Sequence, residues 1–250
     1  MFSKNKFAML LSEFLGTAVL TLAVLSVSKS IGYPFFVSFA AGLTIILMTL
    51  ALGNISGAIF NPAMTIGLWT VRKIRSLQAI VYLVVQLLGG WVAYLLFFKF
   101  FVKVPVSSTQ AAFDSHVLVA EAIGAFIFAF GWAAAIYQKF NVYAKAITIG
   151  GAFALGIIVA SLGSSGLINP AVALGTHSWD LLGSMGWGTY VLGPVLGGVI
   201  GFNLYNLLFV ETEVAEAKVA KVTAPKAVAV KPARKVVAKK STKKTTRRAK

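Results

Sequence analysis

The tripeptide Asn-Pro-Ala occurs twice in this chain, at residues 61–63 and 169–171, and the two copies lie 108 residues apart. Glu13 and Glu121, each the only acidic residue in an apolar segment, have the same separation. A third marker, Leu-Gly-Gly at 88–90, recurs with this offset as well. Three markers at one offset predict a unit that the chain uses twice, which is typical of membrane proteins built from internal repeats.

The composition predicts a membrane protein. Hydrophobic residues make up 58% of the chain and charged residues 12%, whereas soluble domains carry about 25% charged residues. The net charge of +16 is unevenly spread, because 13 of the 23 Lys and Arg residues lie in 211–250. The chain has no cysteine, which excludes disulfides and thiol chemistry.

Six apolar segments have the length of about 20 residues that a membrane-spanning helix needs. They are approximately residues 7–27, 33–53, 77–102, 116–137, 144–163 and 187–210. No cleavage site follows the first segment, so we interpret it as an uncleaved span. Most basic residues of the loops fall on one side, and the positive-inside rule then predicts that both termini are cytoplasmic. Because each repeat has three spans, the second repeat is inverted relative to the first.

Two further apolar stretches, 54–70 and 164–178, are too short to span, and each contains one Asn-Pro-Ala. Asn is a strong N-cap, and Pro is favoured in the first turn of a helix. We therefore expect two half-helices that enter from opposite faces and meet at their N-termini. Two positive dipole ends would face one point, with the NH₂ groups of Asn61 and Asn169 free to donate hydrogen bonds into a lumen. This arrangement favours a pore for neutral solutes.

With these features, the chain resembles the major intrinsic protein family, the aquaporins and aquaglyceroporins, over about residues 7–210. The motifs that carry the resemblance are Asn61-Pro62-Ala63, Asn169-Pro170-Ala171, Glu-Phe-Leu-Gly-Thr at 13–17, Ser56-Gly57-Ala58, Gln-Leu-Leu-Gly-Gly at 86–90 and Gly-Pro-Val-Leu-Gly-Gly at 193–198. The resemblance implies an hourglass pore with Asn61 and Asn169 at its waist. It also implies a homotetramer in which each subunit has its own pore.

The outer selectivity filter departs from the family pattern. Members of the family usually place Arg directly after the second box, and this chain has Val172 there. By the family's spacing, the other three filter positions are Ala41, Ile157 and Gly166. The usual His two residues before the first box is replaced by Ile59. A ring of this composition is apolar and wider than a water-selective filter, so we expect weaker discrimination by size and passage of small neutral solutes such as glycerol.

Glu13 and Glu121 are carboxylates inside predicted spans, where an ionisable residue often marks a proton relay. Their matched positions in the two repeats favour a structural role instead, in which each accepts hydrogen bonds from the backbone of a half-helix loop. A proton-coupled carrier that uses either residue is the alternative reading.

The segment 211–250 has a different composition, rich in Lys, Ala, Val, Thr and Pro, without aromatic residues. We expect it to be a disordered cytoplasmic tail. Its basic residues favour contact with the anionic inner leaflet, and binding to nucleic acid is the alternative.

The sequence thus predicts an all-α membrane protein with six transmembrane helices and two half-helices. The channel domain covers 1–210, with inverted repeats at about 7–102 and 116–210, and the tail covers 211–250. We expect a passive channel of the plasma membrane that carries water or small uncharged solutes and is not an enzyme, with no cofactor and no metal. The rival hypothesis is a non-conducting membrane scaffold of the same fold that displays the basic tail to anionic lipid or nucleic acid.

Overall fold

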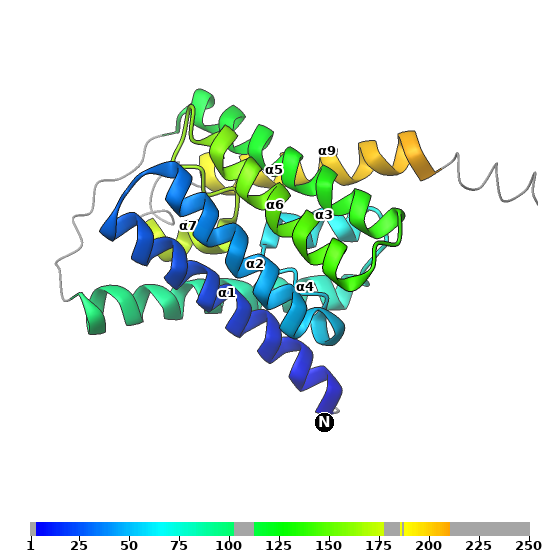
Figure 1. Cartoon of the computed structure of the whole chain (residues 1–250), viewed down its shortest axis with the longest axis horizontal. Coiled ribbons are helices and arrows are strands. Elements are labelled where there is room, and N and C mark those ends of the chain that lie inside the picture. The colour runs from blue at the N-terminus through cyan, green and yellow to red at the C-terminus, as the bar shows by residue number, and fades with distance from the viewer. Residues whose placement is uncertain (1–3, 103–112, 178–185, 187, 211–250) are drawn as a thin grey trace, which may run out of the picture. The chain divides into compact units, whose positions relative to one another are not determined.

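The computed structural model of the chain describes residues 4–102, 113–177, 186 and 188–210. Contacts divide the chain into two units, Met1–Glu213 and Val214–Lys250, and only the first contains described residues. The tail predicted for 211–250 therefore lies outside the described residues. Over the described ranges, every regular element is helical (Figure 1).

Six helical segments are long and apolar enough to cross a membrane. They are α1 (Lys4–Ser30), α2 (Pro34–Ser56), α4 (Ser76–Tyr94) continued by η1 (Leu95–Phe101), α5 (Ser115–Tyr137), α6 (Val142–Ala160), and a last segment made of η2 (Gly188–Leu192), α9 (Gly193–Tyr205) and η3 (Asn206–Val210). Two short helices, α3 (Pro62–Thr70) and α7 (Pro170–His177), lie between them. This arrangement confirms the predicted fold class of six spans and two half-helices.

The helices pack in two equivalent sets. In the first repeat α1 contacts α2 and α4, and in the second α5 contacts α6 and α9. Each short helix also packs on a long helix of the other repeat, because α3 lies against α9 and α7 lies against α4. The repeats are therefore not separate halves, since each one completes the packing of the other.

Glycines allow the closest of these approaches. A Cβ at Gly90 would collide with the carbonyl of Ala171 in α7, and one at Gly198 would collide with the carbonyl of Ala63 in α3. These two contacts are equivalent under the 108-residue offset. Bare backbone at both positions lets the half-helices sit deep between the long ones, as small residues do at helix contacts in membranes.

The outer surface of the helices is apolar. Leu77 is 74% exposed, and Phe39 and Ile147 are each 61% exposed. Exposed apolar side chains at this density would be a liability in water and are what a lipid-facing surface requires. The core instead contains buried polar residues, including Glu13, Gln86 and Glu121.

Basic residues gather at one end of the helices. This end, called the basic end below, is where α1, α4 and α6 begin and where α5 ends. The basic residues of this end whose exposure the structure describes are Lys6, Arg72, Lys73, Arg75, Lys139 and Lys145. The described acidic residues are Glu13, Asp114 and Glu121, of which both glutamates are buried and Asp114 caps the far end of α5. The prediction that the basic end is cytoplasmic stays a prediction.

Candidate pore site

The loop that precedes α3 is held by a carboxylate. Glu13, fully buried in α1, accepts hydrogen bonds from the backbone N–H of Ile59 at 3.0 Å and of Phe60 at 2.8 Å. The side-chain amide of Gln86 in α4 donates to the same carboxylate at 2.8 Å and to the Thr65 hydroxyl at 3.0 Å. Backbone that leaves a helix inside apolar surroundings needs such acceptors, because water does not supply them there.

The loop that precedes α7 repeats this construction. Glu121, fully buried in α5, accepts hydrogen bonds from the backbone N–H of Leu167 at 2.9 Å and from that of Ile168. The Ser164 hydroxyl donates to it at 2.8 Å. Both oxygens of each carboxylate therefore accept hydrogen bonds in the described structure.

Each half-helix is capped by its own asparagine. The Asn61 Oδ1 accepts from the N–H of Ala63 at 2.8 Å and of Met64 at 3.4 Å. The Asn169 Oδ1 accepts from the N–H of Ala171 at 3.0 Å and of Val172 at 3.4 Å. Pro62 and Pro170 occupy the first helical positions, where the missing N–H costs nothing. The two caps fix the asparagine side chains at the helix N-termini.

The two asparagines also join the repeats to each other. The Asn61 Nδ2 donates to the carbonyl of Ile168 at 3.0 Å, and the Asn169 Nδ2 donates to the carbonyl of Phe60 at 2.9 Å. The sequence predicted that these NH₂ groups are free to donate hydrogen bonds into a lumen, and the structure uses part of that donor capacity between the repeats. One hydrogen of each NH₂ group is used across the repeat boundary, which leaves one hydrogen of each amide for another acceptor.

The carbonyls that receive these bonds lie in unusual backbone. Phe60 has a φ of 50° and Ile168 a φ of 41°. Both values fall in the left-handed region, which costs a bulky or β-branched residue roughly 1–3 kcal/mol. The carboxylates of Glu13 and Glu121, which bind the N–H of these same two residues, offset that cost. The strain lies in both loops at equivalent positions and turns one carbonyl of each toward the opposite asparagine.

The four positions of the predicted filter come from four elements. Ala41 lies in α2, Ile157 in α6, Gly166 in the loop before α7, and Val172 in the first turn of α7. All four are buried, and Ala41, Ile157 and Val172 belong to one hydrophobic core cluster. Gly166, at a φ of 63°, leaves no room for a Cβ because the carbonyl of Ile157 lies against it. The structure thus brings Gly166 next to Ile157, and no side chain of the four carries a hydrogen-bond donor.

A cavity opens at the basic end, next to the first half-helix. Its volume is about 310 Å³, and its lining includes Ile59 in the α3 loop and Leu68 in α3. Two cations, Lys73 and Lys145, also line it. The Lys73 ammonium lies 4.3 Å from the centre of the Tyr137 ring, a cation–π contact that holds it in place. Sequence reasoning treated these lysines only as markers of orientation, because nothing local shows that the turn after α3 and the first turn of α6 present them to one cavity.

Among the residues that the structure describes, no three His, Asp or Glu side chains gather as metal ligands would. The polar atoms where α3 and α7 meet are the backbone carbonyls of Phe60 and Ile168 and the side-chain amides of Asn61 and Asn169.

Comparison with known proteins adds to this picture. Residues 2–205 match the family model described as major intrinsic protein. The chain is 30% identical over 236 residues to aquaporin Z of Photorhabdus laumondii, which covers 82% of this chain and 98% of that protein. It is 28% identical over 209 residues to glycerol uptake facilitator protein-like 6 of Lactiplantibacillus plantarum, with 76% of this chain and 93% of that protein covered.

A solved structure shares the fold. The aquaglyceroporin from Plasmodium falciparum superposes with a TM-score of 0.68 at 19% identity, covering 84% of this chain and 99% of that one. At this identity the likeness concerns the fold alone.

Proposed function

The chain belongs to the major intrinsic protein family, and we propose that it is a passive channel that carries small uncharged solutes of the size of glycerol together with water. The observation that carries the proposal is the junction of α3 and α7. There, two helix N-termini are locked together by the reciprocal hydrogen bonds of Asn61 and Asn169. Two positive dipole ends and two amide donors at one buried point favour neutral hydrogen-bond acceptors and oppose cations.

The outer aperture is proposed to consist of Ala41, Ile157, Gly166 and Val172. An apolar ring has lost the donor that replaces part of a solute's hydration shell, and it has also lost a fixed positive charge. Such a ring passes solutes with an apolar backbone, such as glycerol, more readily than an aromatic and charged ring does. The names of the similar proteins include both an aquaporin and a glycerol facilitator, so the comparisons are compatible with water and with glycerol as solutes.

The basic end is proposed to be the cytoplasmic mouth, in a plasma membrane, with both termini on that side. Lys73 and Lys145 line its cavity, and no described residue of that lining is acidic. Their charge opposes the entry of cations at the inner mouth, which partly compensates for Val172 in place of Arg at the outer one. A homotetramer with one pore in each subunit, and contact of 211–250 with anionic lipid or nucleic acid, complete the proposal.

The decisive experiment asks whether transport is passive or is driven by a pH gradient. Purified protein in liposomes is given labelled glycerol, with and without a pH gradient across the membrane. A passive channel brings glycerol to equal concentration on both sides and no further, whichever way the gradient runs. Accumulation above the external concentration, driven by the pH gradient, would reject the proposal in favour of a proton-coupled carrier. The non-conducting scaffold has no support from the comparisons, and equilibration above the rate of empty liposomes would exclude it.

A further inference from the structure

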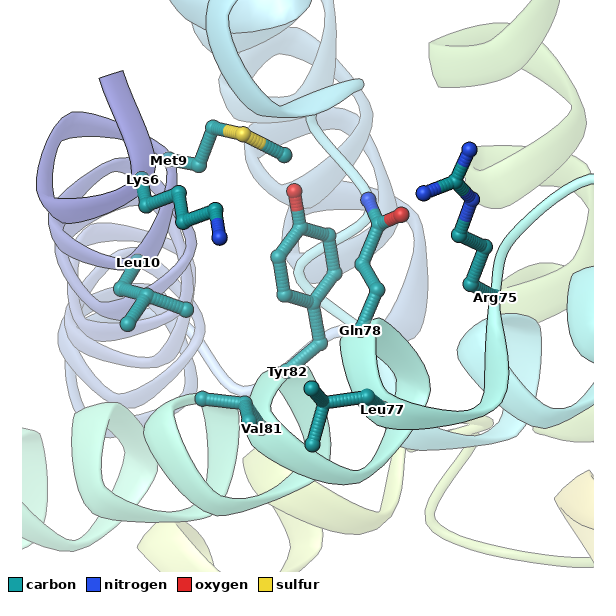
Figure 2. Close-up of a pocket in the computed structure, with 8 residues that line it drawn as sticks. All are labelled: Lys6, Met9, Leu10, Arg75, Leu77, Gln78, Val81 and Tyr82. Atoms are coloured by element: carbon teal, nitrogen blue, oxygen red, sulfur yellow. The ribbon is translucent and has the colours of Figure 1, made fainter. Parts of the chain in front are cut away.

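A second cavity lies at the basic end, between α1 and α4 and away from the asparagine junction (Figure 2). Its volume is about 240 Å³. The side chains that line it are those of Lys6, Met9, Leu10, Arg75, Leu77, Gln78, Val81 and Tyr82. Nothing in the proposed conduction path uses Lys6, Leu77 or Arg75, so this cavity calls for its own explanation.

The cavity combines an apolar wall with two cations. Leu10 from α1 and Val81 from α4 contribute apolar surface, and Leu77 is 74% exposed on the outer side of α4. Figure 2 shows Lys6 reaching in from α1 and Arg75 from the start of α4, with Tyr82 and Gln78 between them. Both basic residues are exposed. An amphipathic ligand with an anionic head is the chemical complement of such a lining.

Among the described residues that line the cavity, no acidic side chain neutralises Lys6 and Arg75. The Tyr82 hydroxyl donates to the carbonyl of Ser56 at 2.9 Å and is therefore occupied. No carboxylate lines the cavity within the described part of the chain, and the described acids lie elsewhere, in the α3 and α7 loop contacts and at Asp114. The positive charge of Lys6 and Arg75 is thus uncompensated by the residues that surround them.

Charge and shape separate the candidate occupants. The segment 211–250 carries 13 basic residues against three acidic ones, so its own charge opposes that of Lys6 and Arg75. A second copy of the chain has no described exposed acidic residue at its basic end that could pair with Lys6 and Arg75. A free anion would satisfy the cations but leave the apolar wall unused. A phospholipid fits both parts, because its phosphate meets the cations while an acyl chain lies along Leu10, Leu77 and Val81.

We propose that the cavity between α1 and α4 binds one anionic phospholipid. Its headgroup phosphate is bound by Lys6 and Arg75 at the mouth of the cavity, and its acyl chain follows the apolar wall toward the middle of the membrane. This cavity shares Gln78 with the cavity beside the first half-helix, and the proposal holds whichever solute the channel carries. It differs from a general attraction of the basic end to anionic membranes, because it assigns the binding to two of the basic residues and not to their total number.

The test compares two double variants of the full chain that lose the same charge. Lys6→Gln with Arg75→Gln removes the cations of the cavity, and Arg72→Gln with Lys139→Gln removes two exposed cations of the same end that do not line it. Delipidated protein in detergent is titrated with phosphatidylglycerol, and bound lipid is counted by native mass spectrometry. Each basic residue near an anionic group contributes about 1 kcal/mol, so the first variant should bind roughly 10- to 30-fold more weakly. The control should stay within about threefold of the wild type.

Equal weakening in both variants, or none in either, would overturn the proposal, because binding would then follow total charge or other residues. Two further arms separate the sources of the phosphate. Phosphatidylcholine should bind the wild type more weakly than phosphatidylglycerol, and inorganic phosphate at the same concentration should not displace the lipid. If phosphate alone displaces it, the cavity is a site for soluble anions and the lipid assignment is wrong. Unchanged melting temperatures of both variants show that each one folds.

Discussion

The two repeats share the residues that hold their half-helix loops together and differ at several of the neighbouring positions. Glu13 and Glu121, Asn61 and Asn169, and the strained residues before each asparagine occupy equivalent positions with equivalent hydrogen bonds. In contrast, Thr65 and Gln86 of the first repeat correspond to Ala173 and Pro194 of the second. The first carboxylate therefore has an amide partner in α4 that the second lacks, whereas Ser164 beside the second carboxylate has its equivalent in Ser56 beside the first.

The two ends of the proposed path differ more strongly. The inner cavity is lined by Lys73 and Lys145, whereas the outer ring proposed at Ala41, Ile157, Gly166 and Val172 has no charged side chain. The duplicated residues build the junction, and the residues that a solute would meet on either side of it are not duplicated. This comparison implies that stability and selectivity reside in different sets of residues, which the following substitutions separate.

The largest effect is expected from the carboxylates. Glu13→Ala or Glu121→Ala removes the acceptor of two buried backbone N–H groups and leaves a cavity, which should cost about 3–5 kcal/mol. Thermal unfolding in detergent should show similar losses for both, because the repeats match here. Asp114→Ala, which removes an exposed helix cap, should cost only about 1 kcal/mol. A glutamate variant as stable as the wild type would show that the loops hold their shape without it.

The next effect concerns the link between the repeats. Asn61→Asp or Asn169→Asp keeps the oxygen that caps the half-helix but removes the N–H that crosses to the other loop. Each should destabilise the protein by about 1–3 kcal/mol and reduce solute flux, since a carbonyl is left without a donor. Solute flux in liposomes measures the loss of transport, and the melting temperature measures the loss of stability.

Asn141 provides a matched control for this pair. Its Oδ1 caps α6 by accepting from Tyr143 at 3.1 Å and Ala144 at 2.9 Å, and it is exposed. Asn141→Asp should therefore change neither melting temperature nor flux. If it is as damaging as Asn61→Asp, the added negative charge and not the loss of the crossed hydrogen bond is the cause.

The outer ring is tested by one position. Val172→Arg should lower glycerol entry by roughly tenfold, equivalent to about 1.4 kcal/mol in the barrier, because it adds both bulk and charge. Val172→Met adds bulk alone and should have a smaller effect. Entry rates of glycerol and urea for both variants, measured by light scattering, distinguish the effect of bulk from the effect of charge. Unchanged selectivity in Val172→Arg would mean that this position does not line the aperture.

The smallest effect is expected at the inner mouth. Lys73→Gln combined with Lys145→Gln should raise cation leak by roughly two- to threefold at low ionic strength and leave glycerol entry unchanged. Lys29→Gln, in the last turn of α1, should change neither. The gain should fade as salt is added, and a leak that salt does not affect would argue against an electrostatic barrier.

The sequence was sufficient to predict the fold because its signals are local. Six apolar stretches of spanning length and two short ones with Asn-Pro-Ala follow from composition and capping preference, and the common offset relates them. The family resemblance then supplied Ala41, Ile157, Gly166 and Val172 as filter positions, which no local pattern marks. These four remain predictions.

The contacts between repeats were beyond sequence reasoning. The Asn61 amide reaches Ile168 only because both loops adopt left-handed backbone at Phe60 and Ile168, and neither residue type favours that conformation. No sequence pattern predicted the cavities at the basic end either, since each is lined by side chains from elements far apart in the chain. Lys6 and Arg75 become neighbours of one cavity through the packing of α1 on α4.

The most direct test of the central claim is stopped-flow light scattering on liposomes that contain the wild-type protein. Osmotic water flux is compared with the entry of glycerol and of urea, and empty liposomes set the background. If an apolar outer ring leads to the asparagine junction, glycerol and urea should both enter well above background alongside water. Water flux without entry of either solute would contradict the wide apolar ring. No flux of any kind, from protein shown to be folded, would contradict the channel itself.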